Sequence, residues 1–231
     1  MDGLPPGTRL GPYEILAALG LGGMGEVYGA LDPNGNSVAF RSNRSGEYQI
    51  WQINEDGSGL RQLTHETKGA VNPVISPDGR RLAFHVHDGQ TTRVYVIDPA
   101  RSWESERLVE IFSAARSVEP TSWSPDGSRI AGYENGSSRP AGGICVIEIA
   151  SKMLVPLVEF GAVPHWLPDG RGLLFRDGAR IRAVDRRSKG VRETLDVSPD
   201  VMSGFALSPD GRTLYVARGP YEAGIWMATL K

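Results

Sequence analysis

One four-residue turn motif recurs along this chain of 231 residues. "SPDG" stands at 76–79, 124–127 and 208–211, "LPDG" at 167–170, and a degraded copy, "DPNG", at 32–35. The turn glycines are separated by 44, 48, 43 and 41 residues, close to the roughly 40–45 residues of a four-stranded propeller blade. This spacing predicts a chain built from five equivalent units.

The residues around each turn predict a strand, a tight turn and a second strand. An apolar residue stands four positions before every turn glycine, and apolar runs such as "LAF" (82–84) and "LLF" (173–175) begin three positions after it. Within the turn, proline fixes φ, Asp or Asn caps the bend, and Gly supplies a positive φ. We therefore interpret four aspartates as turn-capping residues rather than as a ring of reactive carboxylates: Asp78, Asp126, Asp169 and Asp210.

Further strands complete each unit. A third strand follows a polar loop, as in "RVYVID" (93–98), and a fourth ends four of the units, as in "LRQLT" (60–64). Many strands are apolar on consecutive residues, which is typical of sheets that are covered on both faces. The sequence therefore predicts an all-β fold, a β-propeller of about five four-stranded blades, with units starting near residues 32, 71, 118, 162 and 202.

The last unit contains only three predicted strands, the third being "GIWMATLK" (224–231). The unassigned apolar segment is "YEILAAL", residues 13–19. We predict that residues 13–19 dock as the missing edge strand and close the ring, because an open sheet edge leaves backbone groups unpaired. The following segment, "EVYGAL" (26–31), is then expected to be the innermost strand of the first unit.

Residues 32–231 resemble the TolB-like, WD40-like β-propeller family, through segments such as "VISPDGRRLAF" and "TSWSPDGSRIAG". The resemblance implies a β-propeller and a non-catalytic role as a binding or scaffolding module. The expected partner is a protein, with a small ligand as the other choice. Whether the chain is a monomer or a dimer is left open.

Residues 7–32, "GTRLGPYEILAALGLGGMGEVYGALD", resemble the start of a bacterial Ser/Thr protein kinase domain. In that family a glycine-rich loop covers the ATP phosphates, and its positions correspond here to Gly20, Gly22, Gly25 and Val27. Residues 1–31 are thus interpreted as a kinase-like N-lobe remnant that contributes strands to the ring, in a chain derived from a kinase–propeller fusion.

The remaining kinase machinery has no counterpart in the sequence. Arg41 ends the run "VAFR", where a kinase has the phosphate-holding lysine, and no H-R-D, D-F-G or A-P-E motif follows. Arginine does not replace a compact ammonium group at such a site. We therefore expect no enzymatic activity and no cofactor. The alternative is a nucleotide-binding or regulatory remnant of a Ser/Thr kinase.

Bulk properties limit the expected partners and location. A net charge of −2 gives no general attraction to nucleic acid, and no apolar run approaches the roughly 18 residues of a membrane span. Residues 1–10 do not resemble a secretory signal, so we expect a cytoplasmic protein, with a periplasmic role as the less favoured choice. Cys145, the single cysteine, is expected in the core.

Two polar groups have both a functional and a structural interpretation. His85 and His87, with Asp88, have a spacing that a metal ion can use, or they form a strand-end pair. Residues 171–192 carry many cations, which either dock an acidic partner or form a solvated edge. These cations are Arg171, Arg176, Arg180, Arg182, Arg186, Arg187, Lys189 and Arg192.

A propeller fold would gather several loops on one face of the disc. These loops join second to third strands and one unit to the next, and loops on a rigid scaffold are common binding surfaces. We predict this face as the partner-binding surface, with four residues as candidates: Arg44, His87, Arg139 and Tyr221.

Overall fold

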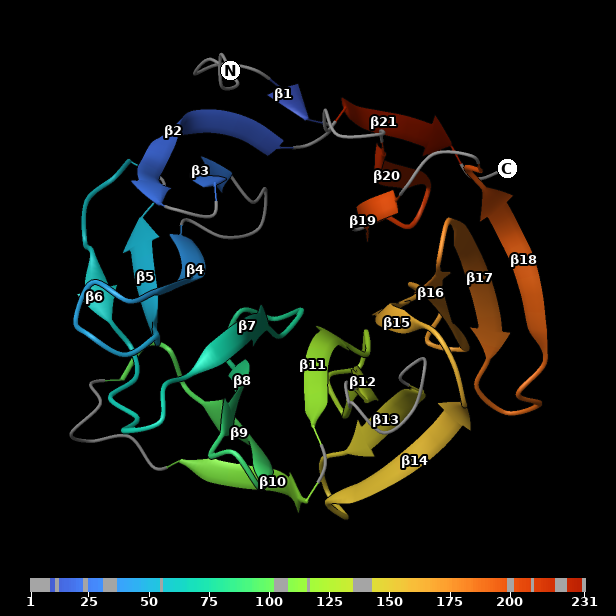
Figure 1. The fold of residues 1–231 in the computed structure, drawn as a ribbon, viewed down its shortest axis with the longest axis horizontal. Coiled ribbons are helices and arrows are strands. Elements are labelled where there is room, and N and C mark those ends of the chain that lie inside the picture. Colours follow the sequence, from blue (N-terminus) through green and yellow to red (C-terminus); the bar gives the residue numbers. More distant parts are fainter. Residues whose placement is uncertain are drawn as a thin grey trace.

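A computed structural model of the chain describes residues 9–10, 13–22, 25–30, 37–54, 56–101, 108–115, 117–134, 143–198, 202–208, 210–218 and 224–229. All regular structure in these ranges is β, arranged as six antiparallel sheets (Figure 1). The same ranges contain no helix long and apolar enough to cross a membrane.

Three of the sheets have four strands each, in the order of the sequence. The first consists of β7 (Val71–Ile75), β8 (Leu82–His87), β9 (Thr92–Ile97) and β10 (Val109–Ala114). The second consists of β11 (Val118–Trp123), β12 (Arg129–Glu134), β13 (Ile144–Glu148) and β14 (Met153–Val158). The third consists of β15 (Ala162–Trp166), β16 (Gly172–Asp177), β17 (Arg180–Asp185) and β18 (Val191–Asp196).

The other three sheets have three described strands each. They are β1 (Arg9–Leu10), β2 (Tyr13–Gly22) and β3 (Gly25–Ala30); β4 (Ser37–Ser42), β5 (Gln49–Asn54) and β6 (Arg61–Gln62); and β19 (Met202–Leu207), β20 (Thr213–Arg218) and β21 (Gly224–Thr229).

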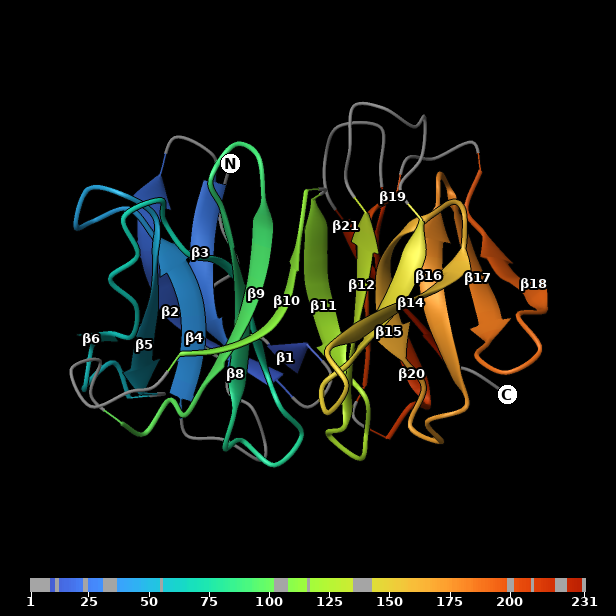
Figure 2. The ribbon, with the colours of Figure 1, turned by 90° about the horizontal axis from the view of Figure 1, so that it is seen from below.

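The sheets follow one another around a ring (Figure 1). The first strands β7, β11 and β15 lie nearest the centre, and the fourth strands β10, β14 and β18 lie at the rim. Seen from the side, the strands run between two faces of a disc, and the loops gather on these faces (Figure 2). This arrangement confirms the predicted all-β propeller.

The N-terminal strands pair differently from the expected pattern. β2, which contains residues 13–19, pairs with β3 and β1 in a sheet of its own, whereas the described partner of β21 is β20. β3 likewise pairs with β2 and not with β4. The physical reason is the short connection: two residues join β2 to β3, and strands joined so closely pair with each other. In Figure 1 this sheet lies between the first and the last repeat units.

Apolar packing between neighbouring sheets forms the core. On β8, Leu82 and Phe84 pack with Ile50 of the preceding sheet, while Ala83 faces the other way and packs with Trp123 of the following sheet. The second strands are therefore buried on both faces, as their consecutive apolar residues predict. Each fully buried large apolar side chain contributes about 1.5–3 kcal/mol, and this contribution exists only when both neighbouring sheets are present.

A buried serine organises each "SPDG" turn. At the turn after β11, Gly127 N donates to Ser124 O (2.8 Å), Arg129 N donates to Ser124 Oγ (2.9 Å), and Ser124 Oγ donates to Asp126 Oδ1 (2.6 Å). The turns after β7 and β19 repeat these bonds around their own serine and aspartate. The interpretation of the four aspartates as turn-capping residues is confirmed.

Polar contacts also join neighbouring sheets. An Arg81 Nη atom donates to Gly127 O of the next sheet (2.8 Å), and the Arg81 guanidinium lies 4.7 Å from the centre of the Trp123 ring. Trp123 Nε1 in turn donates to Val74 O of the preceding sheet (2.8 Å). The β11–β12 turn is therefore positioned by the sheet before it.

Gly161, just before β15, is a position where a side chain should be poorly tolerated. Its φ is +86°, and a Cβ there would lie 2.6 Å from Phe175 Cε2 and 3.0 Å from Arg176 O. We expect Gly161→Ala to lower the free energy of unfolding by about 2–4 kcal/mol, from backbone strain and overpacking.

Urea denaturation of the full chain measures this loss, with Gly178→Ala as the matched control. Gly178 has a φ of +60° and nothing within 4 Å of its added Cβ, so its loss should be about 1 kcal/mol. Equal losses for the two variants would contradict the packing argument at Gly161.

Candidate functional site

Consecutive strands run in opposite directions, so the loops that join them form two sets, one on each face of the disc. Connections between first and second strands, and between third and fourth strands, lie on one face, which is the lower face in Figure 2. Connections between second and third strands, and from sheet to sheet, lie on the other face. Arg44 and His87 belong to this upper face, whereas Arg139 and Tyr221 lie outside the described residues.

Arg44 is exposed but lies against its own sheet. Its Nε donates to Ser42 Oγ (3.1 Å), and its guanidinium carbon lies 4.9 Å from the centre of the Trp51 ring and 5.3 Å from that of Phe40. Such cation–π contacts fix the orientation of the side chain. A role for Arg44 or His87 in partner binding stays a prediction.

The two histidines of β8 occupy different environments. His87 is exposed and its Nδ1 lies 3.0 Å from Thr92 Oγ1, whereas His85 is 5% exposed. Burial lowers the pKa of His85 to about 4, against a smaller opposing effect of the Glu119 carboxylate. Within the described residues, no group of three or more His, Cys, Asp or Glu side chains has the placement to hold a metal ion.

The glycine-rich segment lies on the β2–β3 hairpin. Gly20 and Gly22 are in β2, Gly25 and Val27 are in β3, and the register pairs Gly22 with Gly25 and Gly20 with Val27. A glycine-rich connection between two antiparallel strands is the arrangement that the kinase resemblance implies. Nucleotide binding by this hairpin stays a prediction.

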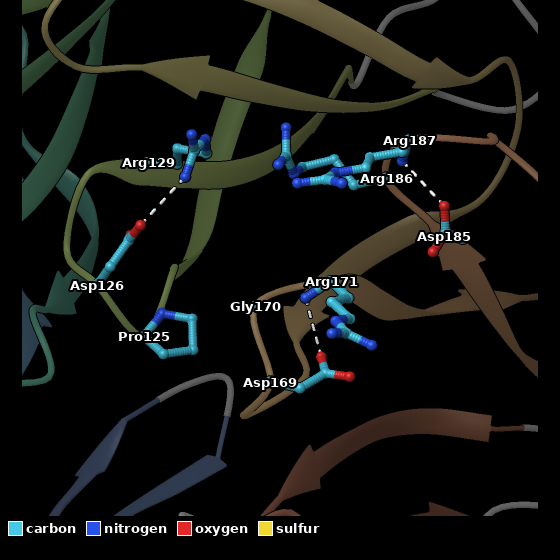
Figure 3. Close-up of a pocket in the computed structure, with 9 residues that line it drawn as sticks. All are labelled: Pro125, Asp126, Arg129, Asp169, Gly170, Arg171, Asp185, Arg186 and Arg187. Carbon is cyan, nitrogen blue, oxygen red and sulfur yellow. Dashed lines mark hydrogen bonds and ion pairs between the residues drawn. The ribbon is translucent and has the colours of Figure 1, made fainter.

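A cleft of about 640 Å³ opens on the lower face, at the boundary of two sheets (Figure 3). Its walls are three turns: the β11–β12 turn of one sheet, and the β15–β16 and β17–β18 turns of the next. The lining residues are Pro125, Asp126, Arg129, Asp169, Gly170, Arg171, Asp185, Arg186 and Arg187. Four arginines and three aspartates make this a charged cleft, which we name the arginine cleft.

The three aspartates of the arginine cleft are committed to their own turns. Hydrogen bonds from the Ser124 hydroxyl, and from the backbone and hydroxyl of Ser128, hold the pKa of Asp126 below its usual range. The backbone and hydroxyl of Ser188 do the same for Asp185, and Asp169 accepts a bond from Arg171 N (2.9 Å). These carboxylates shape the turns.

One of the four arginines is also committed. Arg129 Nε donates to Glu148 Oε1 (2.8 Å), and its Nη1 lies 3.2 Å from Asp126 Oδ2. These bonds raise the pKa of Arg129, the one to Glu148 most strongly. Arg129 is therefore held in a bridge between two carboxylates, and it fixes one wall of the cleft.

The other three arginines, Arg171, Arg186 and Arg187, are different. No hydrogen bond or ion pair joins their guanidinium groups to any residue that the structure describes, and Arg186 Nε is buried without a partner there. Figure 3 shows Arg186 and Arg187 pointing from the end of β17 toward the wall that carries Arg129, with Arg171 on the neighbouring turn. Arg186 N donates to Arg171 O (2.9 Å), which joins the two turns.

The sequence indicated these arginines but not the cleft. All three belong to the basic segment 171–192, yet the predicted binding surface was the opposite face of the disc. Two other arginines of that segment pair within their own sheet: Arg180 Nε lies 2.9 Å from Asp196 Oδ2, and Arg182 Nε lies 2.7 Å from Asp177 Oδ2. Position in the fold distinguishes these arginines: Arg171, Arg186 and Arg187 lie in turns, whereas Arg180 and Arg182, which form ion pairs, lie in a strand.

Comparisons with known proteins agree with this fold. The family description "PD40: TolB beta propeller domain" matches residues 25–159. "Uncharacterized protein Atu1656" of Agrobacterium fabrum is 30% identical over 107 residues, which cover 43% of this chain and 36% of that protein. A "Protein TolB homolog" of Chlorobium chlorochromatii is 36% identical over 97 residues, which cover 34% of this chain and 22% of that protein. The chain thus spans well under half the length of these curated relatives.

Solved structures show the same fold at low identity. The crystal structure of TolB from Acinetobacter baumannii has a TM-score of 0.67 at 17% identity, and covers 83% of this chain and 49% of that one. Enzymes match as well. They are a dipeptidyl-peptidase 5 of Porphyromonas endodontalis, 30% identical over 33% of this chain and 11% of that protein, and an oligogalacturonate lyase in complex with manganese, with a TM-score of 0.62 at 14% identity over 84% of this chain and 59% of that one.

Two buried histidines should make stability depend on pH. Burial lowers the pKa of His85 and of His165 to about 4, below the value of about 6.5 in an unfolded chain. Between these values the unfolded state binds more protons, so the free energy of unfolding falls as the pH drops from about 6.5 to about 4. We expect a loss of roughly 2–3 kcal/mol per histidine across this window.

Urea denaturation at several pH values measures this loss. His165→Phe keeps a ring against Phe205, whose centre lies 4.8 Å from that of His165, and should flatten part of the pH dependence. The matched control is the same exchange at the exposed His65, His65→Phe. A profile in which His165→Phe changes nothing would contradict the assignment.

Proposed function

Because the chain belongs to the family of TolB beta-propeller domains, we propose that it is a non-catalytic module that binds a protein partner, and that the partner docks at the arginine cleft. The observation that carries this proposal is the set of three arginines, Arg171, Arg186 and Arg187, whose guanidinium groups form no hydrogen bond or ion pair with the described residues. The charge of Arg187 also contributes, weakly, to the lowered pKa of Asp185. Arginine is enriched at the energetic centres of protein interfaces.

The rigidity of the cleft walls supports the proposal. The turn hydrogen bonds of Ser124 with Asp126 and of Ser188 with Asp185 fix two walls, and the bridge from Arg129 to Glu148 fixes the side chain between them. A surface that is already ordered loses little conformational entropy when a partner binds. The cleft is therefore suited to recognition.

The chemistry of the cleft supports a non-catalytic role. Its titratable lining consists of aspartates and arginines, and hydrogen bonds hold the pKa values of Asp126 and Asp185 below their usual range. A general base works best when its pKa lies near the working pH, so these carboxylates are poor proton acceptors. His85 and His165 are in other parts of the fold.

Reversing the charge of the cleft should remove the partner. We expect the double variant Arg186→Glu, Arg187→Glu to bind about tenfold or more weakly than the wild-type chain, since it replaces attraction by repulsion. The measurement is capture from an extract of the source cell on immobilised chain, with bound proteins quantified by mass spectrometry.

The matched control is Arg41→Glu, Arg44→Glu, which makes the same charge change on the upper face. Both of these arginines are exposed. The proposal requires a protein that is retained by wild type and by this control and is lost from the cleft variant. A protein lost only from the upper-face control would overturn docking at the cleft and favour the surface around Arg44 and His87.

A second candidate function is nucleotide binding by a remnant of a Ser/Thr kinase, in a chain derived from a kinase–propeller fusion and located in the cytoplasm. The supporting observation is the β2–β3 hairpin, in which Gly20 and Gly22 precede, and Gly25 follows, a two-residue connection. Backbone N–H groups of such a loop can face phosphates. Arg41 in place of the lysine weakens this candidate.

Thermal unfolding with Mg-ATP separates the two candidates. A ligand that binds only the folded state raises the melting temperature, by a few degrees when its concentration is well above the dissociation constant. The remnant predicts such a rise at millimolar Mg-ATP, and no rise with magnesium chloride alone. A flat response to Mg-ATP contradicts nucleotide binding and leaves the propeller module unaffected.

A further inference from the structure

We infer that the segment bound in the arginine cleft is an acidic, extended stretch of protein whose carboxylates are held by Arg171, Arg186 and Arg187. This inference rests on the proposed function, and adds the chemical class of the partner. It follows from a difference among the charged side chains of the cleft walls: some already form hydrogen bonds or ion pairs, and others form none with the described residues.

Two aspartates of the cleft are fully hydrogen-bonded within their own turns. Asp126 accepts hydrogen bonds from Ser124 Oγ (2.6 Å), Ser128 N (3.0 Å) and Ser128 Oγ (2.7 Å), and it pairs with Arg129. Asp185 accepts bonds from Arg187 N (3.0 Å), Ser188 N (2.8 Å) and Ser188 Oγ (3.0 Å). These carboxylates already accept hydrogen bonds within their turns, so they need no donor from a ligand.

The uncommitted groups are the three cations. Arg186 Nε is buried and has no acceptor among the described residues, and a buried donor without an acceptor is destabilising. Because Nε is buried, an incoming carboxylate meets the Nη groups of the same guanidinium, which lines the cleft and can form charge-assisted bonds with carboxylate oxygens. A carboxylate bound there supplies an acceptor that the Arg186 guanidinium lacks among the described residues.

The relative position of the turns indicates more than one carboxylate. The backbone bond from Arg186 N to Arg171 O (2.9 Å) holds the β15–β16 and β17–β18 turns together, and Arg171, Arg186 and Arg187 all line the cleft. In Figure 3 the Arg171 side chain lies apart from the other two, on the side of Asp169. The volume of about 640 Å³ is far larger than one carboxylate group and lies in the range of sites that enclose larger ligands. A short run of extended peptide with several acidic side chains fits this space.

The same walls disfavour a nucleic acid. The chain has a net charge of −2, and three aspartates alternate with the arginines around the cleft. A phosphate backbone carries charge at short, regular intervals and would bring phosphates next to these aspartates. Separate carboxylates on flexible side chains can reach the arginines and avoid the aspartates.

Calorimetric titration of the full chain tests this inference with defined probes. The probe is a peptide of about twelve residues that alternates Glu and Ser, and its neutral twin has Gln in place of Glu. We expect the Glu peptide to bind, the Gln peptide to bind at least about tenfold more weakly, and added salt to weaken the binding of the Glu peptide.

Matched variants locate the site. Arg186→Gln, Arg187→Gln should weaken the Glu peptide about tenfold or more, whereas Arg80→Gln, Arg192→Gln removes the same charge from exposed positions outside the cleft and should change binding less than about twofold. Unchanged circular dichroism and melting temperature would establish that the variants fold. A single-stranded DNA of equal charge completes the set.

Three results overturn the inference: equal binding of the Glu and Gln peptides, equal losses in the two double variants, or DNA that binds as tightly as the Glu peptide through the same arginines. The proposed function fails separately. If the captured partner still depends on Arg186 and Arg187 while the peptides do not distinguish charge, docking at the cleft stands and only the acidic class is wrong.

Discussion

The second strand of each complete sheet is apolar on both of its faces, and no single sheet can cover it. Leu82 and Phe84 of β8 need the sheet before them, and Ala83 on the same strand needs the sheet after it. Because apolar area gains stability only when it leaves water, each sheet depends on both neighbours. A ring of sheets satisfies this demand with one repeated arrangement, and every other feature of the structure is placed by it.

The turns that join first to second strands are held in defined conformations on the surface of the packed sheets. A buried serine hydroxyl accepts from the backbone and donates to the turn aspartate, so the loop has one conformation rather than many. Arg81 and Trp123 then connect the β11–β12 turn and β11 to the preceding sheet. The β11–β12 turn, which forms one wall of the arginine cleft, is of this kind, and this explains how a short polar loop presents side chains at fixed positions.

Much of the fold could be predicted because it depends on residues that are close together in the sequence. Proline, aspartate and glycine at fixed offsets specify the turns, and apolar runs specify the strands; the burial of Cys145, which is 1% exposed, also follows from its neighbours. The repeat suggested that residues 13–19 belong to the last sheet, whereas the two-residue connection pairs β2 with β3. The positive φ of Val163, +52°, could not be predicted, since a β-branched residue disfavours it.

The candidate site was harder to predict for a physical reason. Its residues come from three turns, near Asp126, Asp169 and Asp185. The first turn belongs to one sheet and the other two to the next, so the distance between the walls is set by how the two sheets pack rather than by any one segment. Sequence identified Arg171, Arg186 and Arg187 as part of a basic run, but not which members of that run are neutralised. Arg180 and Arg182 meet carboxylates on neighbouring strands, and only the strand register reveals this.

The cleft also lies at the boundary between two neighbouring sheets of the ring. One wall, with Asp126 and Arg129, belongs to the β11–β14 sheet, and the other walls, with Asp169 and Arg187, belong to the β15–β18 sheet. Any rotation of one sheet against the other must change the width of the cleft. A molecule that contacts both walls therefore opposes rotation of one sheet against the other. Its binding free energy then also stabilises the relative position of the two sheets and makes the disc stiffer.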